Sequence, residues 1–285
     1  PRAGPGAGAG RMKRRVPGWL ALVAGAVFLF LHLPMLVLVA FSFNASRFSV
    51  SWTGFTLDWY RQLLERQDIL RGTWTSLVVG AWTTLLATVL GTLPAQARGR
   101  ALRGRGRALA EGLLYVPVVT PEIVAGVSLL ILFAALPLSL GVVTVVIAHV
   151  AFCVAFVTIV VLARLQGMDR SLEEAALVLG ADEFTVFRRV TLPLLWPGIL
   201  AGALLAFTLS FDDYVITSLV TGPGASTLPV VVYTMVRRNI EPTVNAISTV
   251  ILLVTTLLIW GMDRLGRART ACPGASASGA PSPWA

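Results

Sequence analysis

Six long apolar segments dominate this chain of 285 residues. A bilayer core of about 30 Å needs roughly 20 predominantly apolar residues to be crossed by a helix. Because 56% of the residues are hydrophobic and only 13% are charged, the chain has too little polar surface for a water-soluble globule. The sequence therefore predicts an all-α, polytopic bundle of six transmembrane helices, near residues 19–41, 73–97, 109–134, 142–163, 196–219 and 246–265.

Positive charge is concentrated in a few connections between these segments. The formal net charge is +9, and basic residues cluster within residues 13–15, 98–107 and 264–269. Cytoplasmic loops of membrane proteins carry an excess of arginine and lysine. We therefore expect a multi-pass protein in contact with lipid, with both termini in the cytoplasm. Since the arginines lie at membrane ends and form no basic folded face, we expect no nucleic-acid partner.

The two ends of the chain differ in composition from the apolar segments. Residues 1–18 are rich in Gly, Ala and Arg, and residues 266–285 are rich in Ala, Gly, Ser and Pro. Such segments bury too little apolar surface to offset the entropy of ordering them. We expect two disordered cytoplasmic ends around one transmembrane domain at residues 19–265.

A polar interlude at residues 164–195 separates the fourth and fifth apolar segments. Ser171 and Glu174 have the Ser-x-x-Glu spacing of a capping box, which predicts a helix start at Ser171. The small side chains of Ala175 and Ala176 follow on one face of this helix and allow close docking of a partner. The bland alternative is an ordinary solvated hairpin between two spans.

The rest of this interlude carries signals for a turn and a second helix. Gly180 can end the first helix in a left-handed conformation. Asp182 and Glu183 suit the start of the next helix, because carboxylates are favourable at helix N-termini. We expect Pro193 to stop that helix.

The spacing of the interlude resembles the cytoplasmic loop by which permease subunits of bacterial ABC importers contact their ATPase. The residues that carry this resemblance are Glu174, Ala175, Ala176, Gly180, Leu192 and Pro193. The resemblance implies the type I ABC importer permease fold, with these residues coupling the chain to an ABC ATPase dimer. The chain has no Gly-x-x-x-x-Gly-Lys-Ser/Thr phosphate loop. We therefore expect no cofactor of its own, ATP being bound by the partner ATPase.

Further motifs resemble the permease subunits of spermidine/putrescine importers. They are Ser42-Phe43-Asn44, Trp59-Tyr60, Ser210-Phe211-Asp212-Asp213, Thr221-Gly222-Pro223 and Tyr233-x-Met235. The resemblance implies a polyamine pathway in a bacterial inner membrane. It also implies three kinds of partner: the ATPase dimer, a second, homologous permease and a substrate-binding protein. The alternative within this class is a permease for another small solute, such as an organic cation, a phosphonate or an iron complex.

Three acids lie well away from the ends of predicted spans, where a charged side chain costs several kcal/mol on insertion scales. Glu122 follows the proline-interrupted part of the third span, and Asp212 and Asp213 lie about two thirds along the fifth. Carboxylates could replace the lost hydration of a polyamine's ammonium groups, and Tyr233 could line the same pathway. The alternative is that the two aspartates are hydrated at the interface or order neighbouring loops.

The two histidines each lie in an apolar segment. His32 and His149 have no metal-ligand spacing around them, so we expect each to hydrogen bond to a neighbouring helix.

Two other classes of function fit the sequence less well. An intramembrane aspartyl protease needs two facing aspartates, whereas adjacent residues such as Asp212 and Asp213 project at different angles from a helix. The motifs of that class, Tyr-Asp and Gly-x-Gly-Asp, are missing from the sequence. A channel without an ATPase would not need the interlude's spacing. The sequence therefore favours a transport subunit over an enzyme.

The predicted topology can be tested by cysteine labelling from outside the cell. A cysteine at Ser49 should react with a membrane-impermeant reagent, and one at Gly104 should not. The reverse pattern would contradict the six-span topology and place the interlude on the wrong side of the membrane.

Overall fold

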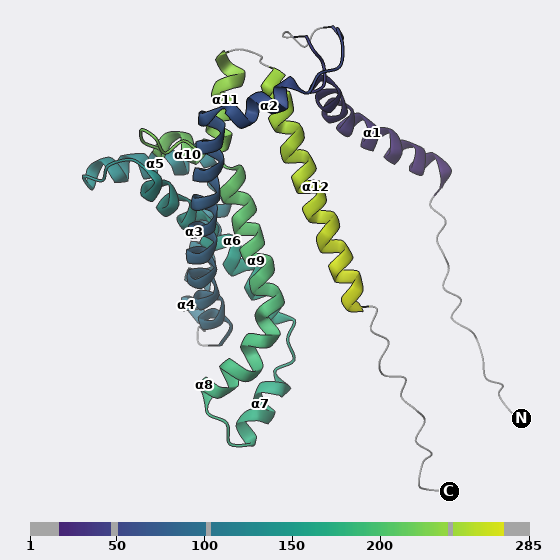
Figure 1. The fold of residues 1–285 in the computed structure, drawn as a ribbon. Helices are drawn as coiled ribbons and strands as arrows, with labels where there is room; N and C mark the ends of the chain where they lie inside the picture. The colour runs from purple at the N-terminus through teal and green to yellow at the C-terminus, as the bar shows by residue number, and fades with distance from the viewer. Residues whose placement is uncertain (1–16, 47–50, 101–103, 239–241, 271–285) are drawn as a thin grey trace, which may run out of the picture. The chain divides into compact units, whose positions relative to one another are not determined.

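The computed structural model describes residues 17–46, 51–100, 104–238 and 242–270, and in these ranges the chain is predominantly helical (Figure 1). The labelling position Ser49 and most of the two ends predicted to be disordered lie outside the described residues. The helical segments are α1 (Gly18–Phe41), α2 (Asp58–Glu65), α3 (Gln67–Arg100), α4 (Gly104–Val119), α5 (Glu122–Ala135), α6 (Val142–Gln166), α7 (Ser171–Val178), α8 (Glu183–Val186), the π-helical turn η1 (Phe187–Thr191), α9 (Leu192–Asp212), α10 (Val215–Val220), α11 (Leu228–Arg238) and α12 (Pro242–Thr270).

The chain forms two compact units, residues 63–239 and residues 1–62 with 240–285. In the second of these units, α1 and α12 contact each other. The segment after α1 is organised by the buried side chain of Asn44. Its Nδ2 donates to the Ser51 carbonyl over 2.7 Å, and its Oδ1 accepts from the Thr53 N–H over 3.0 Å.

The core of residues 63–239 is a bundle of α3, α6 and α9, which run side by side in Figure 1. Val157 of α6 is fully buried between two glycines. A Cβ atom at Gly91 of α3 would lie 2.9 Å from the Val157 side chain, and one at Gly202 of α9 would lie 3.2 Å from it. Glycine at both positions lets the three helix backbones approach closely, which is how membrane helices gain packing without a hydrophobic driving force. At Gly198 of α9 a Cβ atom would lie 2.6 Å from the Arg164 side chain, so α9 and α6 approach closely there too.

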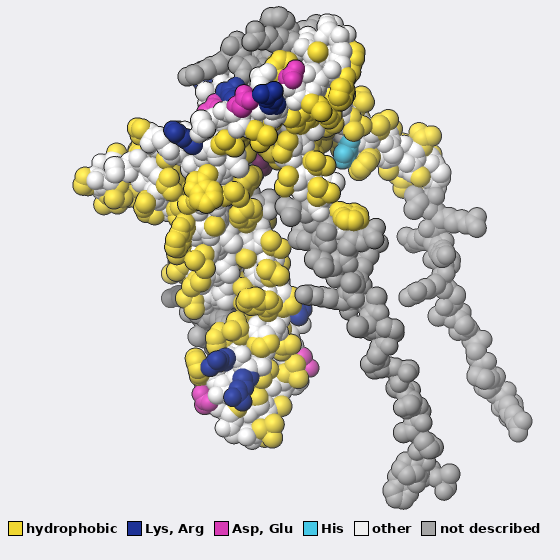
Figure 2. Space-filling view, viewed as in Figure 1, with side chains coloured by type: hydrophobic (Ala, Val, Ile, Leu, Met, Phe, Trp, Pro, Cys, Tyr) yellow, Lys and Arg dark blue, Asp and Glu magenta, His cyan; other side chains and the backbone are white. Residues whose placement is uncertain are grey.

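The outer face of this bundle is apolar over most of its length. Exposed leucines and tryptophans lie along α3 and α9, including Trp82, Leu90 and Leu204. Figure 2 shows hydrophobic side chains over the middle of the face and charged ones gathered at the end formed by α7, α8 and η1. This distribution fits a bundle that meets lipid along its sides and water at its ends.

In the part of the chain that the structure describes, four helical stretches are long and apolar enough to cross a membrane, and a bent pair of helices would make a fifth. The four are residues 18–41, 67–95, 142–166 and 183–212, which correspond to four of the predicted spans. The bent pair, Gly112–Val119 and Glu122–Ala135, turns by 105° where Pro121 interrupts the third predicted span. The sixth span falls on α12, whose described apolar part, Pro242–Leu257, is shorter.

The fifth predicted span, residues 196–219, is not one helix. α9 ends at Asp212, the chain takes an extended conformation at Asp213, and α10 starts at Val215. The apolar pattern continues across this point, so hydropathy alone misses the break. The side chains around Asp213, described below, stabilise this break between α9 and α10.

Packing at Gly91 can be tested by Gly91→Ala. The added Cβ would lie 2.9 Å from Val157 and 3.0 Å from the Val154 carbonyl oxygen. Overpacking of this kind costs about 1–3 kcal/mol, so the purified protein should unfold at a lower temperature. Gly25→Ala on α1 is the control, because nothing lies within 4 Å of a Cβ there. Equal melting temperatures for the two variants would contradict the packing described here.

Candidate functional site

Asp169 lies just before α7, the first helix of the loop at residues 164–195, whose N-cap position is Arg170. The Asp169 carboxylate accepts a hydrogen bond from the Ser171 backbone N–H over 2.9 Å, and this bond holds the pKa of the carboxyl below its usual range. The predicted capping box of Ser171 and Glu174 is therefore wrong. Asp169, two residues before Ser171, supplies the acceptor oxygen instead. Short polar side chains near a helix start compete for the same N–H groups.

Gly180 ends α7 in the predicted left-handed conformation, with φ of +87°. The Gly180 N–H donates to the Leu177 carbonyl over 2.9 Å, and the Ala181 N–H donates to the Ala176 carbonyl over 3.1 Å. This pair of bonds is a Schellman motif, which satisfies the last carbonyls of the helix. The prediction that Gly180 ends this helix in a left-handed conformation is confirmed.

Asp182 begins the second helix of the loop, as predicted. The Thr185 hydroxyl donates to its carboxylate over 2.5 Å and holds the pKa of that carboxyl below its usual range. Because the folded-state pKa is lowered, this capping contributes at neutral pH and is lost as the pH falls through that pKa.

Pro193 does not stop this helix, which contradicts the prediction. After α8 the chain makes a π-helical turn, η1, and continues directly into α9. Pro193 lies in the first turn of α9, where a missing N–H is tolerated. Leu192 is half-buried against the apolar core of the bundle, so the end of the loop is fixed to α9.

A hydrogen bond across the loop ties its two helices together. The buried Thr191 hydroxyl, at the end of η1, donates to Glu173 of α7 over 2.6 Å. Glu174 and Ala175 are exposed, and Ala176 is half-buried. Large apolar side chains beside them are also exposed, and we call them the loop's apolar face: Leu172, Leu177, Val178, Leu179 and Phe184. The two helices of the loop are thus tied to each other, and the loop presents an apolar surface outward.

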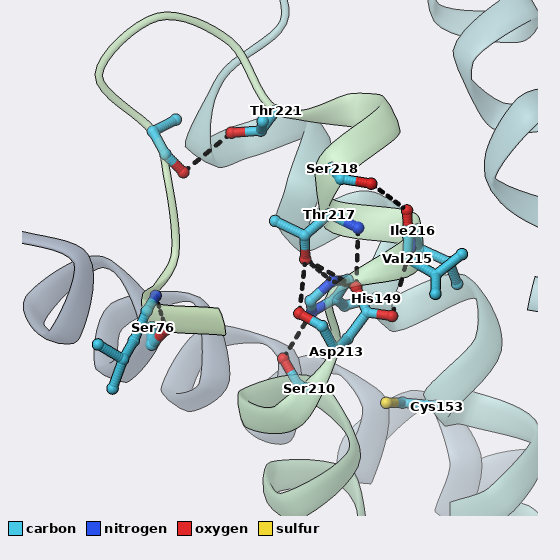
Figure 3. Close-up of polar contacts among 12 residues, drawn as sticks. Ser76, His149, Cys153, Ser210, Asp213, Val215, Ile216, Thr217, Ser218 and Thr221 are labelled. Carbon is cyan, nitrogen blue, oxygen red and sulfur yellow. Dashed lines mark hydrogen bonds and ion pairs between the residues drawn. The ribbon is translucent and has the colours of Figure 1, made fainter. Parts of the chain in front are cut away.

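A second polar site lies at the break between α9 and α10 (Figure 3). The side chain of Asp213 is only 5% exposed. Its Oδ2 accepts from the Thr217 N–H and from the Thr217 hydroxyl, each over 2.7 Å. His149 of α6 contacts the same oxygen through Nε2 over 3.2 Å. The carboxylate therefore caps α10 and joins it to α6.

Two further side chains complete this cluster, which sequence reasoning did not find. The Ser210 hydroxyl lies 2.7 Å from His149 Nδ1, and the Thr217 hydroxyl lies 2.9 Å from His149 Nε2. The prediction that His149 bonds to neighbouring helices is confirmed. For His32 it is wrong, because its Nδ1 contacts the Phe28 carbonyl of its own helix. Ser210 and Thr217 lie three residues before and four after Asp213, the spacing that could have indicated them.

The structure places the two adjacent aspartates in different surroundings. It also brings Tyr233 next to this part of the chain. Asp212 is exposed, whereas Asp213 points into the bundle. Tyr233 of α11 packs on Tyr214, the residue that follows Asp213, with ring centroids 4.2 Å apart. Glu122 is exposed at the start of α5. The helix that starts at Glu122, α5, packs on α10 through Gly126. Within the described residues, no group of three or more His, Cys, Asp or Glu side chains could hold a metal ion.

Comparison with known proteins places the chain in a family. The model of the binding-protein-dependent transport system inner membrane components matches residues 87–270, more than half of the chain. This chain belongs to that family of membrane transport components.

Relatives of known name belong to polyamine systems. The spermidine/putrescine transport system permease protein PotC of Escherichia coli K12 is 39% identical over 245 residues, covering 86% of this chain and 92% of that protein. The putrescine transport system permease protein PotI of the same strain is 42% identical over 240 residues, covering 82% and 85%. A PotC homologue of Mycoplasma pneumoniae is 30% identical over 249 residues, covering 82% and 85%.

Solved structures share the fold at lower sequence identity. A bacterial ABC transporter for the acidic polysaccharide alginate matches with a TM-score of 0.66 and 14% identity, covering 86% of this chain and 94% of that one. The MetNI methionine ABC transporter matches with a TM-score of 0.58 and 18% identity, covering 75% and 99%. These likenesses confirm the predicted importer permease fold.

The turn at Gly180 can be tested by Gly180→Val and Gly180→Asn. A β-branched residue is strained at φ of +87°, whereas asparagine tolerates this conformation. We expect the valine variant to insert into the membrane but to lose ATP-driven uptake, and the asparagine variant to keep most of it. Uptake rates and copurification of the ATPase measure the effect. Normal uptake by the valine variant would show that the turn is not required.

Proposed function

We propose that this chain is a membrane-spanning subunit of an ATP-driven importer for polyamines such as spermidine and putrescine. The observation that carries this proposal is the 39–42% identity to PotC and PotI over more than four fifths of the chain. Both relatives are named as permease proteins of polyamine transport systems. The partners are an ATPase dimer, a second permease and a binding protein outside the membrane. The chain lies in a bacterial inner membrane with both termini in the cytoplasm.

The loop at residues 164–195 is the surface that the ATPase contacts. Its helices are joined by the Glu173–Thr191 bond and its end is continuous with α9. An internally rigid element transmits displacement to the helix it continues into, because packed cores deform little. The exposed apolar face, with Glu174 and Ala175 beside it, supplies the contact area for the partner.

The pathway for the substrate passes the break between α9 and α10. A polyamine needs separated carboxylates for its ammonium groups and aromatic faces for its methylenes. Asp212 supplies an exposed carboxylate there, and Tyr214 and Tyr233 supply a pair of aromatic rings in contact, tilted by 32° to each other. Glu122 contributes a second exposed carboxylate on α5, which packs against α10. Asp213 serves the pathway by fixing α10, because its Oδ2 already accepts bonds from the Thr217 N–H and hydroxyl and its Oδ1 accepts from the Ile216 N–H.

Replacing each aspartate separately tests this division. Asp212→Asn keeps the side-chain shape and removes the counter-charge, so polyamine uptake should fall several-fold with normal assembly. Asp213→Asn replaces one acceptor oxygen beside His149 and Thr217 by an N–H donor, so it should reduce the amount of assembled complex as well. Asp58→Asn at the start of α2 is the control for loss of one exposed charge. Parental uptake by Asp212→Asn would remove this residue from the pathway.

A further inference from the structure

His149 is fully buried in α6 and contacts two other helices. Its Nδ1 lies 2.7 Å from Ser210 Oγ of α9, and its Nε2 lies 2.9 Å from Thr217 Oγ1 of α10. Figure 3 shows the imidazole beside Asp213 and Thr217, with Ser210 on the opposite side. A buried imidazole in this position has a polar partner at each ring nitrogen.

The hydrogen bonds around Asp213 determine where the imidazole carries a hydrogen. Thr217 has one hydroxyl hydrogen, and its two acceptors both belong to Asp213: the carboxylate Oδ2 over 2.7 Å and the backbone carbonyl over 3.3 Å. The Thr217 oxygen can therefore only accept from His149 Nε2. An ionised Asp213 also only accepts, and its Oδ2 lies 3.2 Å from the same nitrogen. A bare nitrogen lone pair at Nε2 would face an oxygen lone pair in a buried site, which is costly.

We propose that His149 carries a hydrogen on Nε2 and acts as the positioning residue that holds the α9–α10 break. Nε2–H donates to the Thr217 and Asp213 oxygens, and Nδ1 pairs with the Ser210 hydroxyl. α6 thereby joins the last turn of α9 to the first turn of α10. This inference deepens the proposed function and rests on it, because the break carries Asp212 and Tyr214.

The short helix α10 depends on this attachment. It has six residues, too few to be stable alone in the absence of packing. A second contact from α6 lies at its other end, where the Thr144 hydroxyl shares its hydrogen between the Gly141 carbonyl over 2.8 Å and the Val220 carbonyl over 2.9 Å. With both ends fixed to α6, the direction of the chain at Asp212 and Tyr214 follows from the position of α6.

Nitrogen NMR of labelled histidine tests the hydrogen position directly. The chain has two histidines, so a labelled His32→Gln chain assembled with unlabelled partner subunits leaves His149 as the only labelled imidazole. His32 is exposed on α1. In the assembled transporter we expect the signal of a protonated Nε2. A signal showing a bare Nε2 with the hydrogen on Nδ1 alone would overturn the assignment, whatever the transported substrate is.

Substitutions at His149 test the positioning role. His149→Gln keeps an N–H donor near the Nε2 position, and His149→Leu keeps volume without a donor. We expect polyamine uptake per assembled complex to fall about tenfold in the leucine variant, the scale of one lost hydrogen bond. The glutamine variant should recover most of that loss. ATPase copurification gives the amount of complex in each case.

A double variant separates this role from general packing. If His149 acts through Asp213, combining His149→Leu with Asp213→Asn should cost little more than the larger single effect. Multiplying effects, or equal uptake per complex by the leucine and parental proteins, would contradict the positioning role. Failure of the proposed polyamine substrate would appear differently, as loss of polyamine uptake by the parental complex itself.

Discussion

The close approach of α3, α6 and α9 is the constraint on which residues 63–239 depend. The Val157 side chain leaves no room for a residue larger than glycine at position 91. The space at position 202 is nearly as small. The Thr158 hydroxyl adds a bond to the Gly91 carbonyl over 3.0 Å. In a bilayer, packing and interhelical hydrogen bonds replace the hydrophobic driving force. The three helices therefore form one tightly packed scaffold.

Both functional regions are built on this scaffold. His149 lies toward one end of α6 and contacts the break after α9. Arg164 lies toward the other end, where its Nε donates to the Leu194 carbonyl over 3.2 Å and its side chain covers Gly198. At about 1.5 Å per residue these positions are roughly 22 Å apart along the helix. One helix thus packs against both ends of α9, next to the loop and next to the break.

Features set by a single residue's chemistry could be predicted from the sequence. The long apolar segments, the left-handed turn at Gly180 and the cap at Asp182 each depend on local properties that the structure retains. Features with competing local solutions could not. Asp169 and Ser171 both suit a helix start, and only the observed backbone shows that Asp169 accepts the bond. A π-helical turn leaves no signal in the composition. The sequence alone therefore predicts that the helix ends before Pro193.

The candidate site shows the same division. Acids inside an apolar segment drew attention to the part of the chain where α9 ends, but the sequence did not distinguish the exposed Asp212 from the buried Asp213. Their roles depend on the break in α9, and the break depends on His149 and Ser210, which are distant or unremarkable in sequence. Pairing across helices is a tertiary property that periodicity does not contain.

The most direct measurement of the central claim is transport by the purified complex in proteoliposomes. The complex would contain this chain, its second permease and its ATPase, with binding protein and labelled spermidine or putrescine outside and ATP inside. The account predicts accumulation of polyamine that requires both ATP and the binding protein. An assembled complex that hydrolyses ATP yet accumulates neither polyamine would contradict it.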